Sequence, residues 1–124
     1  MEDGPFIPLS TQLKVNELSM DGVTVLLAIG DVDIATAPSL CERLAERRGQ
    51  RVVLDLTRTS FCDVAGLRAI TDESRAGRAA GGLFAIVAPT GSPARRLIEV
   101  AGLVGSVEVH DDRSRAISRV RPRR

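Results

Sequence analysis

Apolar and polar residues alternate at the start of the chain and then give way to a continuous apolar run. The alternation extends from Thr11 to Asn16, as in a strand with one buried face. The dipeptide Asp21-Gly22 is a strong hairpin signal, and the apolar run Val23–Ile29 follows it. The pattern therefore predicts two antiparallel strands joined by a tight turn.

Beyond this hairpin, strand-like runs alternate with segments in which apolar residues recur every three or four positions, as they do in helices. The expected helices begin after N-cap residues at Thr36, Asp63, Ser92 and either Asp111 or Asp112, and the expected strands between them are residues 51–56, 83–88 and 106–110. Such alternation is typical of parallel strands joined by crossover helices. The expected fold class is α/β, a mostly parallel mixed sheet that begins with a β-hairpin and carries four helices.

Length and composition fit one soluble domain. The 124 residues are enough for a single core, which we expect to span about residues 9–120, with residues 1–8 and 121–124 mobile. The longest apolar run, Val23–Ile29, is too short to span a bilayer, and the N-terminus lacks the layout of a secretory signal. We therefore expect a cytoplasmic protein with no membrane insertion.

The net charge of +1 hides a basic C-terminus, because six arginines and no acidic residue lie among the last twelve residues. The rest of the chain is acidic and only 2% of the residues are aromatic, which argues against a nucleic-acid partner. We interpret the arginines as a solubilising tail, with contact to an acidic partner or to anionic lipid as the alternative.

Little in the sequence suggests catalysis. The single histidine, His110, lies on a predicted edge strand, and no residues have metal-ligand spacing, so we expect neither an enzyme nor a metal or cofactor. Asp31 and Asp33 could be paired carboxylates, although a solvated loop explains them more simply. Cys41 and Cys62 are interpreted as buried free thiols, and a redox pair is the alternative.

The stretch Arg51–Arg68, RVVLDLTRTSFCDVAGLR, resembles the signature of the STAS domain family of bacterial anti-sigma factor antagonists. Residues 30–38 resemble the family's loop and helix start after the second strand, and residues 95–103 resemble its third helix. The resemblance covers roughly Leu9–Ile117. It implies a sheet of about five strands with helices packed on it, and binding to an anti-sigma factor of the histidine-kinase-like ATPase type.

The resemblance also implies a contact surface, formed by two loops and by the start and exposed face of the second helix. The residues expected to contact the partner are Asp31, Asp33, Ser60, Phe61, Asp63, Val64, Ala65, Gly66, Leu67 and Arg68. Helical periodicity predicts that Leu67 and Ile70 are buried while Arg68 and Asp72 face outward. Gly66 could serve either close packing or close approach of a partner.

One position departs from the family. A serine that a partner kinase phosphorylates often stands where this chain has Val64, so we expect no phosphorylation there. Ser60, Thr59 and Thr57 are weak candidate acceptors, and their other role would be to satisfy backbone groups of the turn. The missing serine keeps two alternatives open: a cytosolic STAS subunit of an ABC-type lipid transport complex, which needs no phosphoserine, and a STAS scaffold protein.

Overall fold

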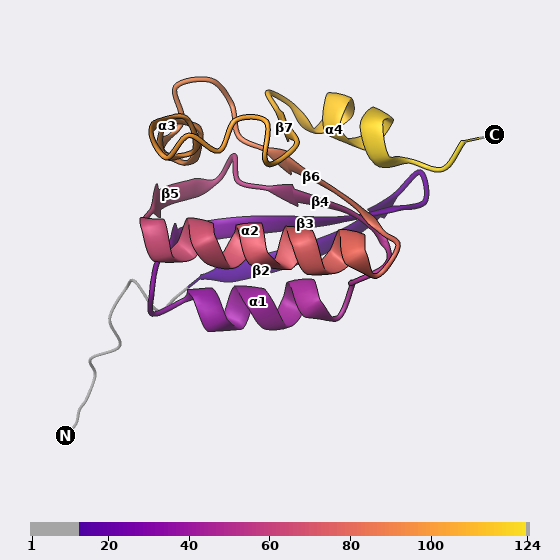
Figure 1. Ribbon diagram of the computed structural model, residues 1–124, viewed down its shortest axis with the longest axis horizontal. Coiled ribbons are helices and arrows are strands. Elements are labelled where there is room, and N and C mark those ends of the chain that lie inside the picture. Colours follow the sequence, from indigo (N-terminus) through magenta and orange to yellow (C-terminus); the bar gives the residue numbers. More distant parts are fainter. Residues whose placement is uncertain (1–12, 124) are drawn as a thin grey trace.

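The computed structural model describes residues 13–123 and shows a layered α/β arrangement (Figure 1). The predictions for residues 1–8 and for Arg124 lie outside this part of the chain, as do Thr11 and Gln12 of the first expected strand. The first strand described, β2 (Lys14–Met20), pairs antiparallel with β3 (Val23–Val32). Asp21 and Gly22 between them have φ of 52° and 77°, as a tight hairpin turn requires, so the hairpin prediction is confirmed.

The described strands form one six-stranded mixed sheet in the order β2-β3-β4-β6-β7, with β5 paired to β3. Parallel pairing joins β3 to β4 (Arg51–Asp55), β4 to β6 (Leu83–Val87) and β6 to β7 (Val109–His110). The central strand β4 is buried from Val52 to Asp55. The α/β class, the hairpin and the mostly parallel sheet are as predicted, with one strand more than expected.

The additional strand is β5 (Thr59–Cys62), in a segment where the sequence predicted a turn and a loop. Its origin lies in the unequal lengths of its neighbours, because β3 has ten residues and β4 only five. Beyond the end of β4, the last residues of β3 would otherwise leave an open edge. Residues 59–62 fill that edge by pairing in parallel with Gly30–Val32.

Helices cover both faces of the sheet. Three helices pack over the larger apolar cluster, which includes Leu26, Leu54 and Ile86: α1 (Ala37–Ala45), α2 (Val64–Ala79) and α3 (Pro93–Val100). Helix α4 (Arg113–Val120) lies on the opposite face and forms a second cluster with Val25 and Val53. Figure 1 shows α1 and α2 side by side and α4 close to the C-terminal end of the described chain.

The predicted N-caps hold at three of the four helices. Asp63 accepts a hydrogen bond from the Gly66 N–H at 2.8 Å, Ser92 from the Arg95 N–H at 3.2 Å, and Asp112, rather than Asp111, from the Arg115 N–H at 2.8 Å. At α1 the prediction is wrong in one respect. Thr36 occupies the N-cap position but makes no side-chain cap.

The reason is that Thr36 serves the preceding loop. Its hydroxyl accepts a hydrogen bond from the Asp33 N–H at 2.9 Å and donates one to the Asp31 carbonyl at 2.8 Å. The Asp33 carboxylate in turn accepts from the Ala35 and Thr36 N–H groups at 2.9 and 3.0 Å. Asp33 is therefore a structural residue of this loop rather than a solvated carboxylate.

The C-terminal arginines also differ from the predicted solubilising tail, because Arg113 and Arg119 belong to the folded domain. Arg113 forms an ion pair at 3.0 Å with Asp55, a carboxylate that is only 3% exposed at the end of β4. Arg119 pairs with Glu108 at 2.7 Å. A buried carboxylate requires such a partner, so Arg113 fixes the first turn of α4 on the sheet. None of the helices in the described chain has the length and apolar character needed to cross a membrane.

Candidate partner-binding surface

The start of α2 lies where β3 and β5 end, and it is held there tightly. The Asp63 N–H donates to the Val32 carbonyl at 3.1 Å, next to the Asp63 cap of the helix. A Cβ atom at Gly66 would lie 2.5 Å from the Val32 carbonyl oxygen and 2.8 Å from a Val32 methyl group. Close packing of the helix on β3 therefore accounts for Gly66, which settles the choice that the sequence left open.

Exposed apolar side chains gather around this helix start. Ile34 in the loop after β3 is 75% exposed, Phe61 in β5 is 51% exposed and Val64 in the first turn of α2 is 55% exposed. These residues come from three segments that meet at one end of the sheet. A group of large apolar residues on the surface of a small domain is typical of an interaction site.

A shallow groove of about 380 Å³ continues this surface between α2 and the end of α3. Val64, Arg68 and Arg75 line its α2 side, and Ala101 and Leu103 line the other. Ile34, Ala101 and Leu103 are not among the contact residues expected from the sequence. The only signal for Ile34 was one large apolar residue within a polar loop, and Ala101 and Leu103 looked like the end of a helix.

The predicted contact residues divide into three groups by exposure. Ser60, Phe61, Val64 and Arg68 are exposed; Asp31, Asp33, Asp63 and Ala65 are half-buried; Gly66 and Leu67 are buried. The two buried residues, the loop carboxylate of Asp33 and the capping carboxylate of Asp63 support the surface from beneath. The exposed residues are the ones that a partner could reach.

The two faces of α2 are as predicted, with Leu67 and Ile70 buried and Arg68 and Asp72 exposed. Asp72 forms its ion pair with Arg75, at 3.5 Å, rather than with Arg68. Within residues 13–123, Arg68 has no ion pair at all. Its guanidinium group is therefore available to a partner.

The three hydroxyls near Val64 differ in accessibility. The Thr57 hydroxyl hydrogen-bonds to the Asp55 carboxylate at 2.5 Å, and the buried Thr59 hydroxyl donates to the Ala28 carbonyl at 3.4 Å. Both hydroxyls are therefore engaged within the fold, but neither bonds to a backbone group of the turn: the partner of Thr57 is a side chain, and that of Thr59 is a carbonyl of β3. Ser60 is exposed.

Both cysteines are free thiols in a setting that disfavours ionisation. Burial, reinforced by the nearby Asp63 charge, raises the pKa of the Cys62 thiol to about 11. Burial also raises the pKa of the half-buried Cys41, with smaller contributions from Glu73 and Asp72. Because the thiolate is the reactive form, both side chains are poor nucleophiles near neutral pH.

The remaining titratable groups do not assemble into a metal site in the described chain, where no three His, Cys, Asp or Glu side chains lie close enough to hold an ion. The His110 ring nitrogen Nε2 lies 3.2 Å from the Glu108 carboxylate. The pKa of Glu108 is lowered, first by the hydrogen bond from Arg119. These groups form a small ionic cluster beside β7, away from the start of α2.

Comparison with known proteins places this geometry in a family. The family model of the STAS domain matches residues 15–116, although no curated protein matches the sequence. An anti-sigma factor antagonist from Mycobacterium paratuberculosis is similar at 26% identity with a TM-score of 0.80, over 90% of this chain and 97% of that one.

Two more distant structures share the fold. The phosphorylated Bacillus cell fate determinant SpoIIAA is 18% identical with a TM-score of 0.62, over 88% of this chain and 99% of its own. The murine Solute Carrier 26 anion transporter Slc26a9 is 16% identical with a TM-score of 0.65, over 78% of this chain and 17% of the transporter. With its sequence and its fold both matching, the chain belongs to the STAS domain family.

Proposed function

We propose that this STAS domain is an anti-sigma factor antagonist that binds an anti-sigma factor of the histidine-kinase-like ATPase type. The observation that carries the proposal is the exposed apolar group of Ile34, Phe61 and Val64 around the start of α2. The likeness to an anti-sigma factor antagonist of nearly the same length supports it. The protein would act in the cytoplasm by binding alone, with no reaction to catalyse.

Docking would bury these apolar side chains at the centre of the contact, and Arg68 would meet a carboxylate of the partner. Aromatic and arginine side chains are enriched among the residues that dominate binding energy, so Phe61 and Arg68 are the expected anchors. An anti-sigma factor occupied in this way could not hold its sigma factor, which would be released by competition.

We further propose that phosphorylation at the helix start does not control this binding. Val64 and Ala65 have no hydroxyl group, and the hydroxyls of Thr57 and Thr59 are engaged within the fold. Incubation with a cognate anti-sigma kinase and ATP should leave the protein unmodified but bound. The variant Val64→Ser should gain a phosphate, since a helix N-terminus favours the product's charge. Stoichiometric phosphate on wild-type Ser60, Thr59 or Thr57, located by mass spectrometry, would contradict this part of the proposal.

The docking surface can be tested with the partner recovered by affinity pull-down from cell extract. Arg68→Ala and Val64→Asp should each weaken binding about thirtyfold, which corresponds to a loss of about 2 kcal/mol. Both should melt close to wild type, because both side chains are exposed. Matched controls are Arg115→Ala, an exposed arginine on α4, and Leu18→Asp, an exposed apolar residue on β2.

The controls should bind like wild type. If Arg68→Ala and Val64→Asp also bind like wild type in calorimetric titration, this surface is not the interface and the proposed mechanism must be abandoned.

A further inference from the structure

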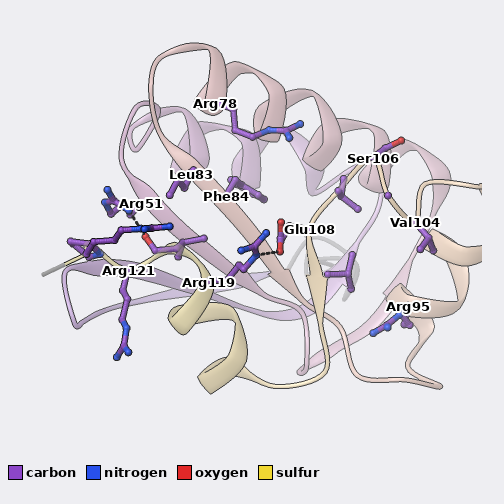
Figure 2. Close-up of a pocket in the computed structure, with 16 residues that line it drawn as sticks. Arg51, Arg78, Leu83, Phe84, Arg95, Val104, Ser106, Glu108, Arg119 and Arg121 are labelled. Carbon is purple, nitrogen blue, oxygen red and sulfur yellow. Dashed lines mark hydrogen bonds and ion pairs between the residues drawn. The ribbon is translucent and has the colours of Figure 1, made fainter.

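A second groove lies at the opposite end of the sheet from the start of α2, where β4 and β6 begin (Figure 2). Its volume is about 920 Å³. Basic side chains come to it from β4, α2, α3 and the C-terminal end of α4. The arginines that line it are Arg51, Arg78, Arg95, Arg119, Arg121 and Arg123.

Carboxylates within the described chain balance three of these arginines and leave the other three unpaired. Arg95 pairs with Glu99 and Asp111, Arg119 with Glu108 and Arg121 with Asp21. Glu108 is the one acidic residue of the lining, and it is already bound to Arg119 at 2.7 Å and lies 3.2 Å from His110. Arg51, Arg78 and Arg123 have no carboxylate partner among residues 13–123; Arg51 donates instead to the Val120 carbonyl at 2.7 Å. Such a concentration of unpaired like charge attracts an anionic partner.

The groove also contains an open stretch of sheet edge. β7 pairs with β6 only at Ile86 and Val87. On the β4 side, the Leu83 N–H donates to the Gln50 carbonyl at 3.0 Å; on the β7 side, the Ile86 N–H donates to the Glu108 carbonyl at 2.7 Å. Because successive residues of a strand alternate in direction, the N–H and C=O of Phe84 point away from β4 and into the groove.

No backbone hydrogen bond joins Phe84 to the segment 104–108 in the part of the chain that the structure describes. The adjoining apolar surface is open as well, since Leu83 is 42% exposed and Val104 also faces the groove (Figure 2). An unpaired edge beside exposed apolar side chains is the arrangement that a segment of another chain uses when it adds a strand to a sheet.

We propose that this groove binds an acidic, extended peptide segment of a partner protein, which pairs with the backbone of Phe84 and places its carboxylates against the arginines. A compact phosphate-bearing molecule would satisfy the arginines but would leave the sheet edge and the apolar side chains unused. In an extended peptide of alternating acidic and apolar residues, the two kinds of side chain point to opposite sides. One side can then meet the arginines while the other covers Leu83.

The groove shares no lining residue with the groove beside the proposed anti-sigma surface, although Leu103 of that groove is the sequence neighbour of Val104 of this one. The groove lies where β4 and β6 begin, and the start of α2 lies where β3 and β5 end. The domain could therefore hold an anti-sigma factor and an acidic segment at the same time. This inference goes beyond the proposed function and does not depend on it.

The test uses a fluorescently labelled octapeptide of alternating glutamate and valine, titrated into the full chain and followed by anisotropy. Binding should weaken steeply between about 0.1 M and about 1 M salt, as the screening length falls from about 10 Å to about 3 Å. Arg78→Gln combined with Arg123→Gln should weaken binding at least about tenfold. The matched control, Arg58→Gln with Arg96→Gln, removes two exposed arginines outside the groove and should change binding by less than about twofold.

Two further measurements address the extended pairing. Bound peptide should slow hydrogen exchange of the Phe84 amide, and a peptide with proline at alternate positions should bind at least about tenfold more weakly because proline has no N–H to donate. The proposal is overturned if the groove variants bind like the control, or if the proline peptide binds equally well. It is also overturned if sodium triphosphate binds more tightly than the peptide, since the groove would then be a site for small anions.

Discussion

The contact between the start of α2 and β3 allows a sharp prediction, because α2 contains two glycines in different surroundings. Glycine in a helix interior costs about 1 kcal/mol relative to alanine, so Gly→Ala normally stabilises a helix. Gly77 meets this expectation, since a Cβ there would have no atom within 4 Å outside its own helix. Gly66→Ala, by contrast, would place a methyl group 2.5 Å from the Val32 carbonyl oxygen.

The expected change in stability follows from the space around each glycine. The carbonyl oxygen of Val32 belongs to the backbone of a sheet strand and cannot rotate aside, so the helix start must shift. Overpacking of this kind costs about 1–3 kcal/mol. Over most of that range the cost is larger than the roughly 1 kcal/mol that alanine gains over glycine in a helix. We expect Gly66→Ala to lower the free energy of unfolding by up to about 2 kcal/mol and Gly77→Ala to raise it by about 0.5–1 kcal/mol.

Urea unfolding followed by circular dichroism measures both variants against wild type, with equal m-values as the check that only native stability has changed. The same substitution in the same helix should thus act in opposite directions. If Gly66→Ala is as stabilising as Gly77→Ala, the helix start is not held against β3 as described. The displaced helix start of Gly66→Ala should also weaken anti-sigma binding, whereas Gly77→Ala should not affect it.

Three other outcomes follow from the buried groups. Arg113→Ala should destabilise the fold by about 2–4 kcal/mol because it leaves the buried Asp55 carboxylate without its cation. Loss of the exposed Arg115 should cost under about 0.5 kcal/mol. Equal losses of the two variants in chemical unfolding would contradict a role for the buried pair. The pKa of Cys62 is raised from 9.0 to about 11, so the folded state favours the neutral thiol. The contribution of Cys62 to stability should be full below pH 9 and should be lost as the pH rises toward 11. The sequence has no tyrosine but the pKa of Cys41 is raised as well, so the decline should be smaller in Cys62→Ala and should disappear when Cys41→Ala is added; an unchanged decline in Cys62→Ala would show that Cys62 does not cause it. Amides of the central strand at Val53 should exchange only on global unfolding, and fast exchange there would show that β4 is not central.

The alternating pattern of the chain was sufficient to predict the hairpin, the central strand and the helices, because those elements follow from local periodicity and turn chemistry. β5 could not be predicted in this way. Residues 59–62 pair with the end of β3 only because β3 extends beyond the end of β4. That difference in strand length exists only once the sheet has formed. The missing side-chain cap at Thr36 could not be predicted either, because its hydroxyl hydrogen-bonds to the loop before the helix.

Charge was harder still to interpret from sequence. Arg113 looked like one member of a basic tail, but the fold brings it to Asp55, 58 residues earlier in the chain. Conversely, Arg51 and Arg78 of the second groove lie far in sequence from Arg119, Arg121 and Arg123, and these residues gather because α2 and α4 end where β4 and β6 begin (Figure 2). A local charge count cannot separate an arginine that stabilises the fold from one that is left for a partner.

The candidate partner surface also depends on which side chains are exposed, and the sequence alone does not show this. In the sequence, Val64 indicated only that a phosphate acceptor is missing. In the structure it is an exposed apolar residue in the same group as Phe61 and Ile34. Under the proposed function, covering the exposed half of Val64 would contribute about 1 kcal/mol to docking. A phosphoserine at this position would instead bring charge to an apolar contact. Under the proposed function, the valine would therefore replace a covalent switch with constant affinity, and release of the anti-sigma factor would have to come from a change in the partner or in its concentration.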